Sequence, residues 1–69
     1  MRPGDLVRFR REYLDPDDEV DKRYVDALGI ITSDQTSLLD AEVGRQLFNV
    51  LVTDHEVGAF DYELEQVQT

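Results

Sequence analysis

The chain has 69 residues and no cysteine, so we expect one small domain, residues 1–69, with neither disulfides nor thiolate metal sites. Sixteen acidic residues against seven basic ones give a net charge of −9, which argues against direct binding to nucleic acid or to an anionic membrane, because affinity for phosphate depends on Lys and Arg. No apolar run approaches the ~20 residues that span a bilayer, and the N-terminus lacks the apolar region of a signal peptide, so a cytosolic location is expected.

The first predicted strand covers residues 6–14 and follows a turn at Pro3 and Gly4. Its apolar residues alternate with charged ones, which is typical of a strand with one buried face and one solvated face. The side chains expected to face the core are Val7, Phe9 and Tyr13. Those expected to face solvent are Arg8, Arg10 and Glu12. We expect the arginines to pair with acids of the following loop or of the C-terminus.

An acidic segment follows at residues 15–21, where five acids and a proline predict a solvated loop rather than a strand. The acids are Asp15, Asp17, Asp18, Glu19 and Asp21. Their spacing resembles the start of a calcium-binding loop, but the EF-hand pattern requires Gly at its sixth position and Glu at its twelfth, where this chain has Val20 and Asp26. The sequence therefore predicts no metal site and no cofactor.

The middle of the chain contains one predicted strand, at residues 29–32, between two segments that each fit two structures. Residues 22–28 fit either a turn or a strand that returns to the sheet. Residues 37–44 fit either a short helix or a loose loop. Ser37 and Asp40 resemble a helix-capping pair, and Gly44 suits the position just after a helix.

Residues 46–53 form the clearest predicted strand, and apolar residues on both of its faces indicate a strand that is central or covered by a long loop. One face consists of Phe48, Val50 and Val52. The other consists of Leu47, Leu51 and Thr53. A hairpin tip is expected at residues 54–56, followed by a strand at 57–60. Residues 61–67 then predict a tight turn and a short last strand, with Leu64 and Val67 buried.

Together, four or five short strands separated by turns, with a basic first strand, predict a small all-β protein folded as an antiparallel barrel. Several short motifs occur along the chain in a characteristic order. They are GDLVR at residues 4–8, GII at 29–31, VLVTD at 50–54, EVG at 56–58 and ELE at 63–65. In these motifs the chain resembles the small SH3-like β-barrel proteins encoded by tailed bacteriophages, including those of cyanobacterial hosts.

The resemblance implies an SH3-like barrel of about five short strands, with a long acidic first loop and one short helix or 3-10 turn. It implies little about chemistry, because most members of that group are uncharacterised. Two positions depart from the usual pattern. Leu51 or Val52 replaces a bulky aromatic residue that is common in the third strand, and His55 replaces a glycine in the hairpin tip. The first departure argues against an aromatic ligand-binding platform on that strand.

The only histidine, His55, is the best catalytic candidate because the carboxylates of Asp54 and Glu56 flank it and a carboxylate can orient a general base. However, adjacent side chains at a hairpin tip usually diverge, and no serine or cysteine nucleophile has a sequence signature nearby. We therefore interpret His55 as an exposed turn residue and predict a protein that is not an enzyme and has no catalytic residues.

The predicted function is contact with another protein, either as a structural or accessory component of a virion or as a modulator of a host protein. Opposite charges placed together orient a partner, so the predicted surface combines two arginines with the acidic loop. Its residues are Arg8, Arg10, Asp15, Asp17, Asp18, Glu19 and Asp21. The partner is a second copy of the chain, a virion protein or a host protein, and the expected location is the host cytoplasm or the virion.

An alternative function follows from the acids themselves. A compact protein with a net charge of −9 can imitate the phosphates of a duplex and occupy a basic groove. In that case the protein inhibits a basic DNA- or RNA-binding protein of the host.

Overall fold

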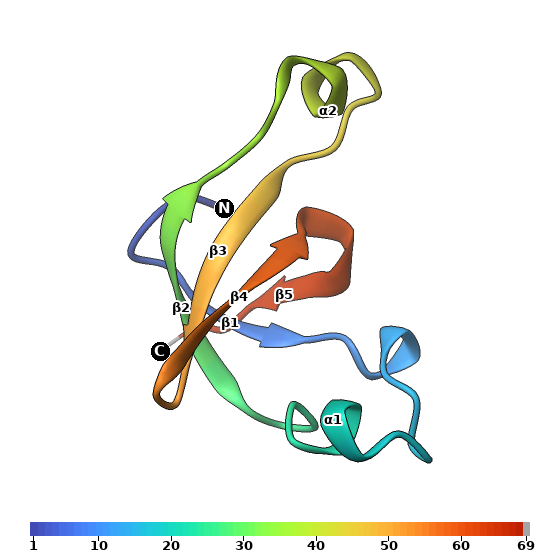
Figure 1. The fold of residues 1–69 in the computed structure, drawn as a ribbon. Coiled ribbons are helices and arrows are strands. Elements are labelled where there is room, and N and C mark those ends of the chain that lie inside the picture. The colour runs from blue at the N-terminus through green and yellow to red at the C-terminus, as the bar shows by residue number, and fades with distance from the viewer. Residues whose placement is uncertain (69) are drawn as a thin grey trace.

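A computed structural model describes residues 1–68 and shows a five-stranded antiparallel sheet with short helical segments between the strands (Figure 1). The strands are β1 (Leu6–Phe9), β2 (Leu28–Asp34), β3 (Leu47–Val52), β4 (His55–Phe60) and β5 (Leu64–Gln66). The helical segments are the helices α1 (Glu19–Lys22) and α2 (Leu38–Glu42) and the 3-10 turns η1 (Arg11–Tyr13) and η2 (Asp61–Glu63). The predicted small all-β fold is confirmed.

The strand order in the sheet is β4-β3-β2-β1-β5, so the last strand pairs with the first. The core lies on one face of the sheet, where every second residue of a strand is buried because side chains alternate between the two faces. The buried residues are Val7, Phe9, Ile31, Phe48, Val50, Val52, Ala59 and Leu64. Strand β3 has a neighbour on each side, which confirms a central strand, but its outward-facing Leu51 is exposed rather than covered by a loop.

The predicted first strand is too long, because β1 ends at Phe9 and η1 follows it. The backbone N–H of Arg10 donates to the carbonyl of Glu63 at 2.8 Å, and that of Tyr13 donates to the carbonyl of Arg10 at 3.1 Å. A 3-10 turn has three residues per turn instead of the two-residue repeat of a strand. The side chain of Tyr13 is therefore 50% exposed, and its predicted place in the core is wrong.

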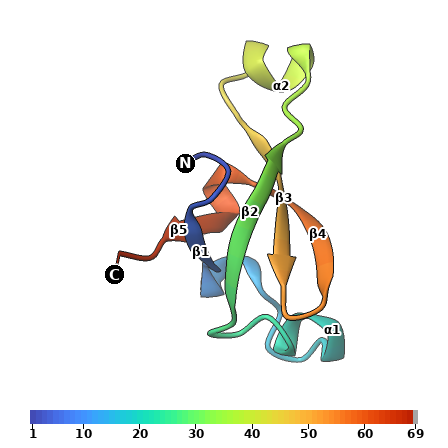
Figure 2. The same ribbon diagram turned by 90° about the vertical axis from the view of Figure 1, so that its left-hand side faces the viewer.

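Within the acidic loop, one turn of helix forms that the sequence did not predict. The Asp18 side chain accepts hydrogen bonds from the backbone N–H groups of Val20 and Asp21, which caps α1. After α1 the chain turns rather than returning as a strand, and Tyr24 packs its ring 5.3 Å from that of Phe9. Figures 1 and 2 show α1 at one end of the molecule and α2 at the opposite end.

The hairpin between β3 and β4 is shorter than predicted. Val52 pairs with His55, so the turn consists of Thr53 and Asp54, and the positive φ angle of 58° falls on Thr53. His55 is the first residue of β4 instead of a residue of the tip. At the other end of β4, η2 leads into β5 as the predicted tight turn, and Leu64 is fully buried whereas Val67 is only half-buried. Within residues 1–68, neither helix has the length and apolar composition needed to cross a membrane.

Candidate functional site

The two arginines of the predicted surface both make their polar contacts with β5. Arg8 donates from Nε to Oε1 of Glu65 at 2.8 Å, and the two residues are also cross-strand partners in the sheet. Arg10 donates from Nε to the backbone carbonyl of Leu64 at 3.1 Å. The predicted pairing of an arginine with a C-terminal acid is therefore confirmed for Arg8.

The carboxylates of the acidic loop bind the backbone of the loop itself. Asp21 accepts from the N–H of Asp15 at 2.8 Å, and Asp15 accepts from the N–H of Asp17 at 2.9 Å. Glu19 forms an ion pair with Lys22 at 3.3 Å. Among residues 1–68, no group of three or more His, Asp or Glu side chains is placed to hold a metal ion. A surface that joins this loop to Arg8 and Arg10 stays a prediction.

His55 takes part in a chain of hydrogen bonds. Its Nε2 lies 2.9 Å from the hydroxyl of Tyr24, and its Nδ1 lies 3.1 Å from Oδ1 of Asp54. The expectation that adjacent side chains diverge here is wrong, because the turn ends before His55. The hydrogen bond with His55 lowers the pKa of Asp54. The side chains of His55 and Asp54 are both exposed to water. The structural effect of the hydrogen bond between Tyr24 and His55 is to attach the segment of Tyr24 to β4.

Four planar side chains form a row, contributed by η1, η2, the end of β4 and the segment between α2 and β3. We call it the aromatic row and define it as Tyr13, Tyr62, Phe60 and Arg45. The ring centroids of Tyr13 and Tyr62 lie 5.6 Å apart, and those of Tyr62 and Phe60 lie 5.4 Å apart with planes inclined by only 7°. The guanidinium carbon of Arg45 lies 4.7 Å from the Phe60 centroid.

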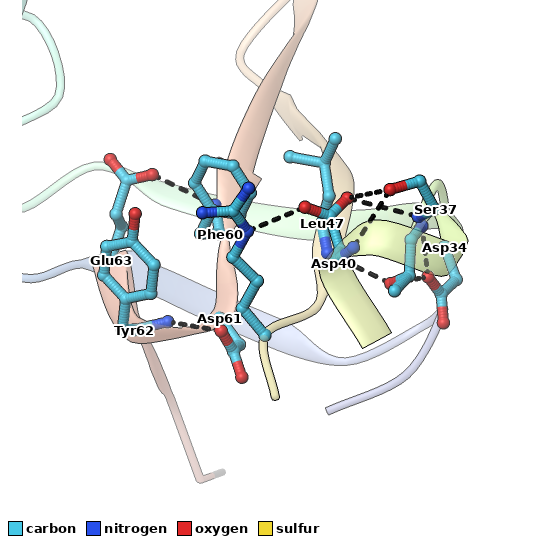
Figure 3. Close-up of polar contacts among 10 residues, drawn as sticks. Asp34, Ser37, Asp40, Leu47, Phe60, Asp61, Tyr62 and Glu63 are labelled. Atoms are coloured by element: carbon cyan, nitrogen blue, oxygen red, sulfur yellow. Dashed lines mark hydrogen bonds and ion pairs between the residues drawn. The ribbon is translucent and has the colours of Figure 1, made fainter. Parts of the chain in front are cut away.

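The central ring of the row is carried by a well-ordered turn. Glu63 Oε1 accepts from the backbone N–H of Phe60 at 3.0 Å, and Asp61 Oδ1 accepts from that of Tyr62 at 2.9 Å (Figure 3). These bonds hold η2 in shape and leave Tyr62 46% exposed. Sequence reasoning missed this row because Tyr13 was assigned to the core. The available signal was Tyr62, an aromatic residue placed between two acids in a predicted turn.

The Arg45 end of the row is joined to α2 through a buried carboxylate. Arg45 donates from Nε to Oδ1 of Asp40 at 2.7 Å (Figure 3). Asp40 also accepts from the backbone N–H of Ser37 at 3.2 Å, while the Ser37 hydroxyl accepts from the N–H of Asp40 at 3.1 Å. Of the two structures that fit residues 37–44, the short helix with its capping box is confirmed, and Gly44 follows it with a φ angle of 77°.

Acid should loosen this helix. The hydrogen bond from Arg45, together with those from Ser37, lowers the pKa of Asp40 below its ordinary value of 3.8. A carboxylate with a depressed pKa stabilises the fold at every pH above its unfolded value and loses that effect as the pH falls through the folded value. We therefore expect the NMR shifts of the α2 amides to move toward unfolded values below pH 3.8.

Asp40→Asn provides the control for this prediction, because it removes the charge at every pH while keeping the shape. The variant should show loosened α2 shifts already at neutral pH. The Thr36 hydrogen bonds lower the pKa of Asp34 as well, so a small acid response should persist in the variant. Wild-type α2 shifts that stay constant throughout the acid range would contradict the assignment.

Comparison with known proteins gives no match to any family model, curated protein or solved structure. The resemblance to phage SH3-like proteins therefore stays a prediction.

Proposed function

We propose that the protein is a docking module that binds a partner protein, and that the aromatic row takes an extended, basic segment of that partner. The observation that carries this proposal is the pair of half-exposed rings of Tyr13 and Tyr62, 5.6 Å apart and backed by Phe60. Large apolar side chains grouped on a surface are typical of interaction sites, whereas single ones need no explanation.

Aromatic rings suit the binding of an extended segment because they offer contact area at a low cost in side-chain entropy. Proline-rich segments dock on aromatic surfaces in this manner. Ring faces also attract the planar guanidinium group of arginine. The row already contains one such contact, between Arg45 and Phe60 at 4.7 Å.

The charges near the row favour a basic partner. Tyr13 lies within residues 10–21, which contain six acids against two bases, Arg10 and Arg11. Asp61 and Glu63 flank Tyr62 on the other side of the ring pair. Complementary charges of this kind steer a basic segment and set its orientation. Single-stranded nucleic acids also stack on aromatic rings, but their phosphates would be repelled by these acids.

The proposal keeps two of the three predicted partner classes, a virion protein and a host protein. It also keeps a role for the predicted acidic residues, namely Asp15, Asp17, Asp18, Glu19 and Asp21, as the charged border of the row. Arg8 and Arg10 have a structural role in this proposal, since their side chains bind β5 and the backbone of Arg10 binds the end of η2.

The test is an NMR titration with a synthetic peptide of four Arg-Pro-Pro repeats. We expect saturable shifts of the Tyr13 and Tyr62 ring signals. Loss of one ring contact is worth about 0.5–2 kcal/mol, so Tyr62→Ala should weaken binding by about 2- to 30-fold, while Tyr62→Phe should bind nearly as well as the wild type.

Two controls accompany the titration. A peptide in which Glu replaces every Arg should not bind, and Leu28→Ala, at an exposed site on β2 outside the row, should leave the affinity unchanged. Binding of the arginine peptide that is equal in wild type and Tyr62→Ala would show that the row is not the site. If the Tyr13 and Tyr62 ring signals showed no saturable shift with the arginine peptide, the proposal would be wrong.

A further inference from the structure

Helix α2 buries a charged side chain and exposes its apolar ones, which is the opposite of an ordinary surface helix. Its only buried residue is a carboxylate, Asp40. Its large aliphatic residues face solvent, with Leu38 86% exposed and Leu39 73% exposed, and Val43 just after the helix is 68% exposed. A surface helix normally turns its apolar stripe toward the core and its charges toward water. We call the three exposed residues, Leu38, Leu39 and Val43, the α2 knob.

The knob is held in one shape by polar contacts of the segment that carries it. At its start, Asp34 accepts from the backbone N–H of Thr36 at 2.9 Å, and the Thr36 hydroxyl accepts from the N–H of Leu47 at 3.0 Å. At its end, the ion pair between Arg45 and Asp40 closes the loop over the helix at 2.7 Å. The segment that carries the aliphatic side chains is therefore already ordered before a partner binds. Binding does not pay the entropy cost of ordering a loose loop.

The shape of the molecule indicates what kind of surface fits the knob. In Figures 1 and 2, α2 stands away from the sheet at one end of the molecule. A convex group of three aliphatic side chains requires a concave apolar surface to bury it. The last residue of α2 is an acid, Glu42, and the chain as a whole carries a net charge of −9. A pocket with a basic rim complements both features.

A second copy of the chain is a poor occupant. In a symmetric contact a second copy would present the same convex knob instead of a concave surface. Two copies would also bring together two net charges of −9. We propose that the α2 knob inserts into an apolar pocket with a basic rim on a partner protein, at a binding surface separate from the aromatic row.

The experiment places the photo-crosslinking residue benzoylphenylalanine at position 39 of the full chain, in the cells that naturally make the protein. The control places it at Ile30, an apolar site on β2 that is 47% exposed. The protein cross-linked from position 39 is then purified and titrated with the wild type and with three variants, Leu39→Ser, Ile30→Ser and Glu42→Lys.

We expect one protein to be cross-linked from position 39 and not from position 30. Burial of a leucine side chain implies that Leu39→Ser weakens its affinity by about tenfold or more, while Ile30→Ser changes it by less than about twofold. Glu42→Lys should also weaken binding and reduce its salt dependence. Leu39→Ser and Glu42→Lys should keep the wild-type melting temperature, because these side chains are exposed.

Three results would overturn the proposal. They are a cross-link that joins two copies of this chain, no cross-link from position 39, and a cross-linked partner that binds Leu39→Ser as tightly as the wild type. The Arg-Pro-Pro peptide should bind Leu39→Ser with unchanged affinity, since the knob lies outside the aromatic row. Failure at the knob is thereby distinguished from failure of the proposed function.

Discussion

Replacing Phe48 by alanine should bring the protein close to unfolding at 25 °C. Phe48 is the largest fully buried side chain, on the central strand β3. Truncation of a buried Phe costs about 3–5 kcal/mol, because it loses apolar burial and leaves a cavity. Small domains are stable by only about 5–15 kcal/mol, and one of 69 residues is expected near the low end.

Thermal and urea unfolding followed by circular dichroism would measure the effect. For a domain of this size the melting temperature falls by about 4–8 °C for each kcal/mol. Leu39→Ala is the matched control, since it also truncates a large apolar residue but at an exposed position of α2. We expect it to change the free energy of unfolding by less than about 0.5 kcal/mol. Equal losses in the two variants would show that Phe48 does not lie in the core.

The second large effect is expected from Gly29→Ala, a substitution that adds a single methyl group to β2. An added Cβ at this position would lie 2.6 Å from Cγ1 of Val50 and 3.2 Å from the backbone carbonyl oxygen of Leu51. Val50 is itself fully buried and the Leu51 oxygen belongs to a paired strand, so neither can move freely. Overpacking of this kind costs about 1–3 kcal/mol.

Gly58→Ala is the control for this prediction. Gly58 also lies in a strand, β4, but an added Cβ there would meet no atom within 4 Å. Alanine restricts the unfolded chain more than glycine does, so this variant should be neutral or stabilised by up to about 1 kcal/mol. Urea unfolding of both variants gives the comparison. Destabilisation of the same size at both positions would mean that loss of glycine itself matters, instead of the contact with Val50.

The proposed binding surfaces are connected through one residue. Arg45 lies over Phe60 at one end of the aromatic row and pairs with Asp40 inside α2. Its side chain therefore supports both the row and the segment that presents the α2 knob. Arg45 was not among the predicted site residues. It contacts Asp40 and Phe60, which are far apart in the chain and are brought together by the hairpin of β3 and β4.

Several elements could be predicted because they depend on local properties of the chain. The buried face of β3 follows from the two-residue alternation of Phe48, Val50 and Val52. The helix at residues 38–42 was one of two alternatives for its segment, and it contains the predicted capping pair of Ser37 and Asp40, which lie three positions apart. The two-residue alternation also predicted that Tyr13 is buried, which is wrong because β1 ends at Phe9. Just after that end, the backbone N–H of Arg10 donates to the carbonyl of Glu63, a residue far away in the chain.

The sequence by itself thus determined the all-β class, a count of four or five short strands, the buried face of β3 and the strongly acidic composition. The tertiary structure alone decided which side chains meet on the surface. Tyr13 and Tyr62 are far apart in the chain and lie 5.6 Å apart in space, and Tyr24 binds His55 across the end of the sheet. The physical reason is that alternation and capping act over a few residues, whereas such contacts depend on strand pairing between distant segments.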